Sequence, residues 1–304
     1  MRTDHEFQST DGVNNIVWTL WEPETKPVAV LQIIHGMSEH ILRYDDFARY
    51  LNGFGIVVAG DDHLGHGRTA KPGDLGYFGE KKGWKFLRED EEKLHHILKD
   101  MYPDCKVSVL GHSMGSFILR GWMAKHGKNS GNFIIMGTCG KNSAAGAGIT
   151  LCKALRLTKG SKGHSDLLDK MAFGAYAKRI TNPRTPFDWL TTDDAIVDKY
   201  IDDPYCGFPF TIAGYQDLLS TIQYIGDDKW YTLVPKNRPI LIVSGWDDPV
   251  GNYGKGPAEV CEKLQAAGCG DVSLTLFENM RHEILNEHGK EAVYELIKDF
   301  VLEA

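Results

Sequence analysis

The sequence predicts an α/β protein whose mostly parallel sheet is covered by helices and interrupted by a helical insertion. Three observations support this class. Strand-like and helix-like segments alternate up to about residue 140 and again after residue 236. Between them, residues 141–235 contain no strand of the buried parallel type but many aromatic and aliphatic side chains. The chain has 304 residues, 42% of them hydrophobic, which is enough to bury the core of one large domain.

The first part of the chain opens with strands and then alternates. Residues 5–10 and 16–22 have the partly alternating polarity of strands and are separated by the turn DGVNN. Val28–Ile34 is a continuous apolar run, which suits a strand that is buried on both faces. Helices and strands are then expected to alternate. The helices are expected at residues 44–55, 84–103 and 114–126, and the strands at residues 56–60, 106–111 and 132–137.

Residues 141–235 are predicted to form an all-helical cap over one end of the sheet. A disordered linker is not favoured, because this segment contains many aromatic and aliphatic side chains that can be buried in a core. Helical patterns occur at residues 166–180 and 193–204. Six of its aromatic residues, taken one by one, are expected to belong more to the core of the cap than to the wall of a ligand site, although some must face the cavity beneath the cap and the sequence does not say which: Phe173, Phe187, Trp189, Phe208, Phe210 and Tyr215.

After the cap, the alternation resumes with strands at residues 239–245 and 272–278, each followed by a helix, at 255–268 and 289–303. Both strands are expected to be buried. The predicted organisation is therefore a core made of residues 1–140 and 236–304, with a cap made of residues 141–235.

The segment VLGHSMGSF (residues 109–117) carries the frame Gly-x-Ser-x-Gly around Ser113. By itself, the frame fits a structural turn as well as a catalytic serine. Here it follows a predicted strand and precedes a predicted helix, so Ser113 would lie on a sharp bend with an exposed Oγ. The free N–H groups of the helix N-terminus would lie nearby, where they favour negative charge. Ser113 is thus the candidate nucleophile.

A serine nucleophile needs a base and an acid that orients the base, and in this type of bend they follow in the order acid, then histidine. The strand at 239–245 is followed by Asp247 and Asp248, and the residues alone do not decide between them. The last strand is followed by His282, the candidate base; His288 lies beside a helix start and suits a solvated surface role. Both loops follow the carboxyl ends of strands, where sites of parallel α/β sheets gather.

The oxyanion of an acyl-transfer reaction needs two main-chain donors, one from the residue after the nucleophile and one from the loop after an early central strand. Met114 supplies the first. HGMSEH follows the strand Val28–Ile34, so the N–H of Met37 is the candidate second donor. His35 itself is expected to be a packed, hydrogen-bonded histidine.

The segment GDDHLGHGRT (residues 60–69) places His63 and His66 beside Asp61 and Asp62 and could suggest a metal site. It lacks the alternating pattern of hydrolytic zinc sites, no third histidine follows at ligand-like spacing, and its glycines indicate a tight loop. No phosphate-binding loop is found either. We therefore expect no metal and no cofactor.

The net charge of −7 and the scattered lysines and arginines disfavour a nucleic acid or an anionic membrane as partner. The N-terminus lacks the apolar core of a signal peptide, and no apolar stretch reaches the roughly 18 residues of a transmembrane helix. Six dispersed cysteines without a CxxC pair are typical of free thiols in the cytoplasm. Oligomeric state is left open.

Together, the motifs HGMSEH, DDHLGHGRT, GHSMGS, SGWDDPVG and MRHEILNE resemble those of the α/β-hydrolase superfamily, in its branch of monoacylglycerol lipase-like and lysophospholipase-like serine hydrolases, often grouped with the serine aminopeptidases. The resemblance covers nearly the whole chain. It implies an eight-stranded, mostly parallel sheet with antiparallel first strands. It also implies Ser113 as nucleophile, His282 as base, Met37 and Met114 as oxyanion donors, and Asp248 as the acid because this residue directly precedes the Pro-Val pair.

The expected function is that of a cytoplasmic serine hydrolase that cleaves a small-molecule acyl ester through an acyl-enzyme, without a cofactor. Monoacylglycerol-like, lysophospholipid-like and smaller acyl esters are candidate substrates; the polar segment TKGSKGHSD and the acids of the cap do not favour a long acyl chain. Two alternatives stay open, namely an amidase or peptidase of the same fold and a ligand-binding protein of this fold without catalysis.

Overall fold

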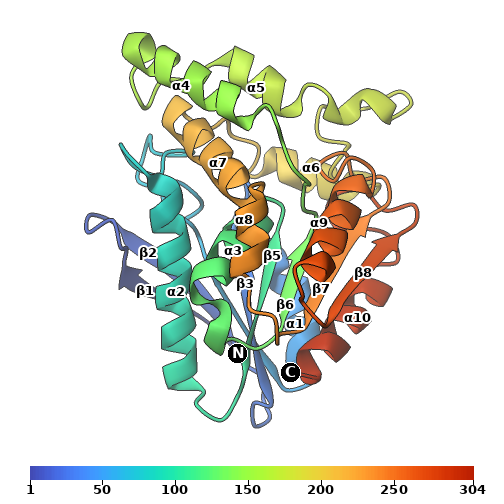
Figure 1. Ribbon diagram of the computed structural model, residues 1–304. Helices are drawn as coiled ribbons and strands as arrows, with labels where there is room; N and C mark the ends of the chain where they lie inside the picture. Colours follow the sequence, from blue (N-terminus) through green and yellow to red (C-terminus); the bar gives the residue numbers. More distant parts are fainter.

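The computed structural model describes residues 1–304, apart from the side chain of Asn129. Its centre is an eight-stranded sheet (Figure 1). In order across the sheet, the strands are β1 (Arg2–Gln8), β2 (Asn15–Trp21), β4 (Ile56–Asp61), β3 (Ala29–Ile34), β5 (Val107–His112), β6 (Phe133–Met136), β7 (Ile240–Gly245) and β8 (Val272–Phe277). β2 runs antiparallel to both of its neighbours, β1 and β4, and all other neighbours are parallel. This confirms the predicted fold class.

Helices cover both faces of the sheet, and a hydrophobic core fills the space beneath each layer. One face packs against α2 (Gly83–Met101), α3 (Met114–His126) and α9 (Lys255–Ala266), and the other packs against α1 (Asp45–Asn52) and α10 (Glu291–Leu302). The strands from β3 to β7 are buried on both faces, which explains their continuous apolar runs.

β8 differs from these strands, because it lies at the edge of the sheet. Most of its side chains are only half-buried. The prediction that this strand is buried was therefore wrong, since nothing pairs with its outer edge in the described part of the chain.

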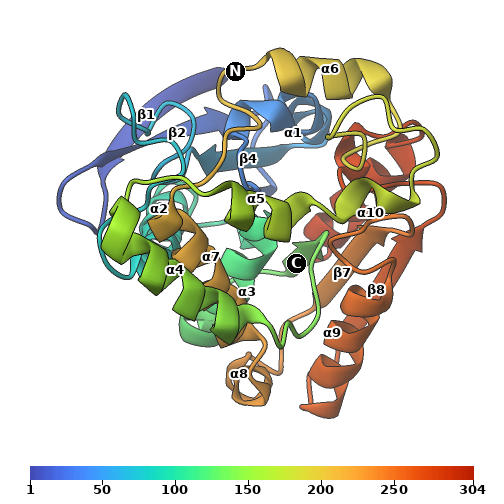
Figure 2. The same ribbon diagram turned by 90° about the horizontal axis from the view of Figure 1, so that it is seen from above.

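Between β6 and β7 the described chain forms helices and no strand: α4 (Ala145–Lys159), α5 (Asp166–Phe173), α6 (Asp194–Asp202), α7 (Ile212–Ile225) and α8 (Asp228–Leu233). Figures 1 and 2 show α4, α5 and α7 gathered at one end of the sheet. We call residues 141–235 the helical insertion. Its all-helical character agrees with the expectation, whereas its division from the core as a separate cap stays a prediction.

The helical insertion was predicted only in part. The helix at residues 193–204 is found as α6, which Asp193 caps by accepting from the main-chain N–H groups of Ala195 and Ile196. α4 and α7 were missed. These two helices pack on each other, and a Cβ on Gly148 would lie 2.8 Å from Cδ1 of Leu219. Small residues that permit this approach weaken the periodic apolar pattern on which helix prediction depends.

Asp217, on α7, connects the helical insertion to α2. Its Oδ2 accepts a hydrogen bond from the main-chain N–H of Gly83, at 3.1 Å, at the start of α2. The side chain is buried, and burial raises the pKa of Asp217 from 3.8 to about 7. The folded protein thus binds this proton more tightly than the unfolded chain does. The protonated side chain of Asp217 therefore contributes to the free energy of unfolding at about pH 4, and this contribution is lost as the pH rises through about 7.

We expect Asp217→Asn to remove this pH dependence, because an amide stays neutral and its oxygen still accepts from Gly83. At pH 8 the variant should unfold several degrees above the wild type, a gain of up to about 4 kcal/mol. At pH 4.5 the two proteins should unfold at similar temperatures. Thermal unfolding at both pH values measures this, and an unchanged or lower unfolding temperature at pH 8 would contradict it.

All six cysteines are free thiols, as predicted. Across the described residues, no helix combines the length and the apolar character that a membrane span requires.

Candidate active site

Ser113 lies on the bend between β5 and α3, in the backbone conformation φ 55°, ψ −121°. This conformation is rare for a residue with a Cβ and marks local strain. The two glycines of the motif permit the bend. A Cβ on Gly111 would lie 2.4 Å from the carbonyl oxygen of Gly115, and a Cβ on Gly115 would lie 2.0 Å from that of Ile34. Helix α3 can therefore pass directly over β3 and β5.

Asp248 and His282 follow β7 and β8, and the tertiary structure brings them together. Nδ1 of His282 lies 3.0 Å from Oδ1 of Asp248, and the two side chains are 2% and 0% exposed. Asp248 also accepts from the Ser244 hydroxyl at 3.1 Å and from the Val250 N–H at 2.8 Å. Burial alone would raise the pKa of Asp248, but the charge and hydrogen bonding of His282 and these donors hold it below its ordinary value. Asp248 is thus held as a carboxylate.

The competing residues lie elsewhere. Asp247 is exposed to solvent, and it is Asp248 that pairs with His282. The side chain of His288 is 74% exposed, in line with the surface role expected for it. His112 is buried, and its Nε2 lies 3.2 Å from the carbonyl oxygen of His282. Of the two aspartates and three histidines, it is therefore Asp248 and His282 that lie against each other.

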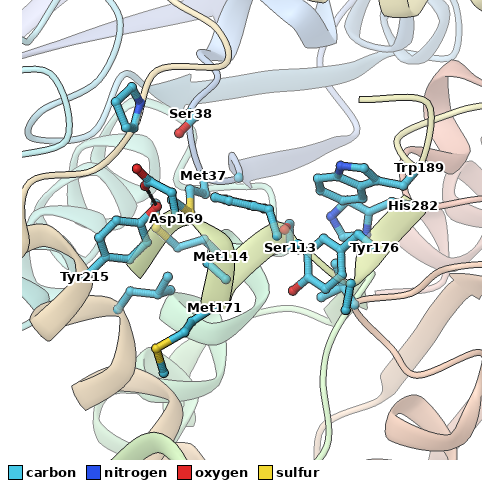
Figure 3. Close-up of a pocket in the computed structure, with 18 of the residues that line it drawn as sticks. Met37, Ser38, Ser113, Met114, Asp169, Met171, Tyr176, Trp189, Tyr215 and His282 are labelled. Atoms are coloured by element: carbon cyan, nitrogen blue, oxygen red, sulfur yellow. Dashed lines mark hydrogen bonds between the residues drawn. The ribbon is translucent and has the colours of Figure 1, made fainter. Parts of the chain in front are cut away.

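Ser113 and His282 both line a cavity of about 790 Å³ between the sheet and the helical insertion. Figure 3 shows the Ser113 side chain beside the ring of His282, with Trp189 over that ring. The ring centroids of Trp189 and His282 are 5.2 Å apart. The predicted nucleophile and base therefore share one cavity, and an aromatic side chain from the insertion shields the base from solvent.

The two residues predicted to donate to the oxyanion, Met37 and Met114, line the same cavity as Ser113. Met114 is the first residue of α3, so its N–H has no partner within the helix. Met37 belongs to the loop that follows β3, which we call the oxyanion loop (residues 35–37) after the role predicted for Met37. The oxyanion loop passes close to the bend, because a Cβ on Gly36 would lie 3.2 Å from Cβ of Ser113.

A buried charge network that the sequence analysis missed supports this region. Oε1 of Glu39 accepts from the Gly36 N–H at 2.6 Å and from the Tyr44 hydroxyl at 3.0 Å. Arg43 donates to Oε2 of Glu39 at 2.6 Å and to both carboxylate oxygens of Glu283 at 2.6 and 2.7 Å. Burial would raise the pKa of Glu39, but the hydrogen bond with His112 and the charge of Arg43 hold it well below its ordinary value.

This network links the oxyanion loop to the loop that carries His282, through residues some 240 positions apart in the chain. Its members lie within a few residues of predicted site residues, in HGMSEHILRY and MRHE, and this adjacency is the signal that could have found them.

Residues 188–192 of the helical insertion are clamped to the loop of His282. Arg281 donates to the carbonyl oxygens of Asp188 and Thr191, at 2.6 and 3.0 Å. Glu287 accepts from the N–H and the hydroxyl of Thr192 and from the Arg281 N–H. Trp189 is therefore held in place over His282 by bonds on both sides.

The cavity wall is mostly apolar, and the helical insertion supplies much of it. The sequence left open which of the six aromatic residues face the site, and the structure places five of them at the cavity wall. Phe173, Phe187, Trp189, Phe208 and Tyr215 all line the cavity, because the insertion folds over the end of the sheet. Phe210 instead packs against His66 and Phe78. Asp169 and Tyr215 are hydrogen-bonded to each other and form a polar group in this wall (Figure 3).

The residues of GDDHLGHGRT have separate structural partners. Asp62 accepts from the Ile41 N–H at 2.9 Å and from Nε of Arg68 at 2.7 Å. The ring of His66 stacks on Phe78. Asp61 and His63 lie together with Glu91 of α2, with one ligand-type atom of each within 4.8 Å of the others.

Comparison with known proteins places this geometry in a family. The sequence model of the family described as serine aminopeptidase, S33, matches residues 25–289. The monoglyceride lipase homolog of monkeypox virus is 37% identical over 88% of this chain and 86% of its own length. The monoacylglycerol lipase of Mycolicibacterium smegmatis is 25% identical over 99% of this chain and 97% of its own length.

Among solved structures, a thermostable carboxyl esterase from Bacillus coagulans, in complex with glycerol, superposes with a TM-score of 0.93. It is 33% identical, and the match covers 99% of both chains. These relatives confirm the resemblance that the motifs indicated. The chain therefore belongs to the serine aminopeptidase S33 family and is an α/β-hydrolase.

Proposed function

We propose that Ser113, His282 and Asp248 are the catalytic triad of this ester hydrolase, and that monoacylglycerols are its preferred substrates. The observation that carries the proposal is the buried pair of His282 and Asp248, 3.0 Å apart, beside Ser113 in a mostly apolar cavity. An acid, a base and a nucleophile arranged in this way are what acyl transfer through serine requires.

In the proposed reaction, Nε2 of His282 takes the proton of the Ser113 hydroxyl as Oγ attacks the ester carbonyl carbon. Asp248 holds the imidazole by its Nδ1 and stabilises the cation that forms. The N–H groups of Met37 and Met114 donate to the oxyanion of the tetrahedral intermediate. His282 then protonates the leaving alcohol, which departs and leaves an acyl-Ser113. A water molecule, deprotonated by His282, releases the carboxylic acid and restores Ser113.

We assign the helical insertion the role of a cap that excludes water from this reaction. Its support is that residues from α4 to α7 line the cavity together with Ser113, and that residues 188–192 are bonded to the His282 loop. A water-poor site strengthens the attraction between the developing oxyanion and its donors.

The chemistry of the cavity favours a neutral, hydroxyl-bearing head group. Asp169 and Tyr215 provide a carboxylate and a hydroxyl that can bind alcohol groups, and the remaining wall suits an acyl chain. The carboxylate of Asp169 would repel the phosphate of a lysophospholipid, and Lys170, the cation beside it at the cavity wall, is largely exposed to solvent, where its attraction for a phosphate is screened. Two relatives named as monoacylglycerol lipase or its homolog, and the glycerol-bound esterase, agree with a glycerol ester. The free cysteines fit a cytoplasmic location.

A substrate panel tests this proposal. We expect 1-monoacylglycerols to be hydrolysed with a kcat/KM at least about tenfold above that of lysophosphatidylcholine with the same acyl chain, a difference of about 1.4 kcal/mol in transition-state binding. Matched p-nitrophenyl esters and p-nitroanilides should differ strongly in favour of the ester. Faster anilide cleavage would favour an amidase. Tight binding of a monoacylglycerol without turnover and without fluorophosphonate labelling would favour a non-catalytic protein.

A further inference from the structure

A second group of buried titratable side chains lies behind the oxyanion loop and has no part in the reaction as described. We call Asp61 at the end of β4, His63 in the loop that follows, and Glu91 of α2 the rear cluster. Nδ1 of His63 lies 2.8 Å from Oδ1 of Asp61 and 3.3 Å from Oε1 of Glu91. All three side chains are at most 2% exposed.

His63 joins the rear cluster to the oxyanion loop. The main-chain N–H of His63 donates to Nε2 of His35, at 3.2 Å, so this nitrogen is an acceptor. The proton of the neutral His35 ring is therefore on Nδ1, which donates to the carbonyl oxygen of Gly36 at 2.8 Å. In the other direction, Nε2 of His63 lies 3.1 Å from the carbonyl oxygen of His35 and donates to it. The two rings stack with centroids 3.8 Å apart.

Because Nε2 of His63 is used in this way, its Nδ1 faces the two acids. Burial and the charge of Asp61 raise the pKa of Glu91 well above its ordinary value, which favours the neutral acid. Burial alone would lower the pKa of His63, but the charge of Asp61 raises it, which favours the imidazolium. Asp61 then accepts a hydrogen bond from Glu91 and faces Nδ1 of His63 at 2.8 Å as a close charged contact, since this nitrogen has no hydrogen bond of ordinary geometry. The rear cluster is neutral as a whole. Oε2 of Glu91 accepts from Nε2 of Gln32 at 2.7 Å.

We propose that Glu91 and Asp61 are positioning residues for the hydrolytic reaction, and that they act through His63 and His35 to hold the Met37 N–H at the site of the oxyanion. This inference rests on the proposed function, because that function makes Met37 an oxyanion donor. Such donors stabilise a transition state only when they are already aligned. The oxyanion loop has no regular secondary structure, so its alignment depends on contacts of this kind.

Asp61, His63 and Glu91 also carry the types of side chain that can bind a metal ion. Two ligands of a tetrahedral zinc ion, each about 2.0–2.1 Å from the metal, lie about 3.3 Å apart. The 2.8 Å between Nδ1 of His63 and Oδ1 of Asp61 is shorter than this spacing, whereas the 3.3 Å between Nδ1 of His63 and Oε1 of Glu91 equals it. The short contact between His63 and Asp61 favours a pair of opposite charges over a shared metal ion, and the experiment includes the metal ion as an outcome.

The test compares Glu91→Leu with Glu91→Gln. Leucine removes the donor to Asp61, so kcat for p-nitrophenyl butyrate should fall by about 10- to 100-fold while KM changes less than about twofold, because oxyanion donors act in the transition state. Glutamine can still donate to Asp61 and accept from Gln32, so its kcat should stay within about threefold of the wild type. If Glu91→Leu does not fold, the isosteric Asp61→Asn serves instead and should show the same loss of kcat.

Asp90 provides the matched control. It is the adjacent buried acid of α2, but it binds Ser9 and Thr10 near the N-terminus, at 2.7 and 2.6 Å, and not the oxyanion loop. Asp90→Asn should keep the wild-type kcat even if its unfolding temperature falls. A general loss of stability is thereby separated from a loss of alignment.

Wild-type kcat in both Glu91→Leu and Asp61→Asn would overturn the inference. So would one equivalent of a divalent metal in the purified wild type together with equal losses in Glu91→Gln and Glu91→Leu. Failure of the proposed function is a different result, in which the wild type neither hydrolyses esters nor reacts with fluorophosphonate at Ser113.

Discussion

Ser113→Ala is expected to abolish ester hydrolysis and to leave the fold intact. Without Oγ no acyl-enzyme can form, and we expect kcat for p-nitrophenyl butyrate to fall by at least about 10⁴-fold. Alanine keeps the Cβ and the same strained backbone of φ 55°, so the unfolding temperature should change by less than about 2 °C. Ester hydrolysis and thermal unfolding of the same preparation measure both parts.

Ser143, an exposed serine before α4, provides a control, and Ser143→Ala should keep the wild-type kcat. Labelling with a fluorophosphonate, followed by mass mapping, should place the adduct on Ser113 alone. Retained activity in Ser113→Ala, or an adduct on another residue, would show that the nucleophile has been misassigned.

Asp248→Asn should be severe and Asp247→Asn mild, although the two residues are neighbours. Asp248 is fully buried and pairs with Nδ1 of His282, so an amide there would favour the wrong tautomer of the imidazole and leave its cation unpaired. We expect kcat to fall by about 10³- to 10⁴-fold, as for other triads of this type. Asp247 is exposed, so its variant should keep kcat within about twofold.

Steady-state kinetics of both variants on one ester, with circular dichroism to verify folding, measures this contrast. The reverse ranking would assign the acid to Asp247. Similar, severe losses in both variants would indicate that the whole loop after β7 is disturbed and that the contrast does not report on the acid.

The sequence predicted the fold and most of the candidate site because both depend on local signals. Continuous apolar runs marked the doubly buried strands, and a glycine-flanked serine between a strand and a helix marked the bend at Ser113. Asp248 and His282 could be named because each follows a strand of a parallel sheet, where polar residues gather at one edge. The choice of Asp248 over Asp247 came from family resemblance alone, and the structure adds a physical reason, burial against His282.

The missed parts depend on contacts between distant segments. Arg43 pairs with Glu283, and Glu91 faces His63, although nothing in the local sequence relates them. Some aromatic residues of the insertion were expected to face the site, but which of them do so depends on how the insertion lies over the sheet.

The sequence by itself thus determined most of the order of strands and helices and the candidates for nucleophile and base, and it narrowed the acid to two neighbouring aspartates, because hydrophobic period, turn residues and motif order are properties of neighbouring positions. Only the tertiary structure decided which buried acids share protons, which aromatic side chains line the cavity and what holds the oxyanion loop. These properties depend on distance and desolvation in three dimensions. The energy of a buried charge is determined by its neighbours in space, and these come from segments that are far apart in the sequence.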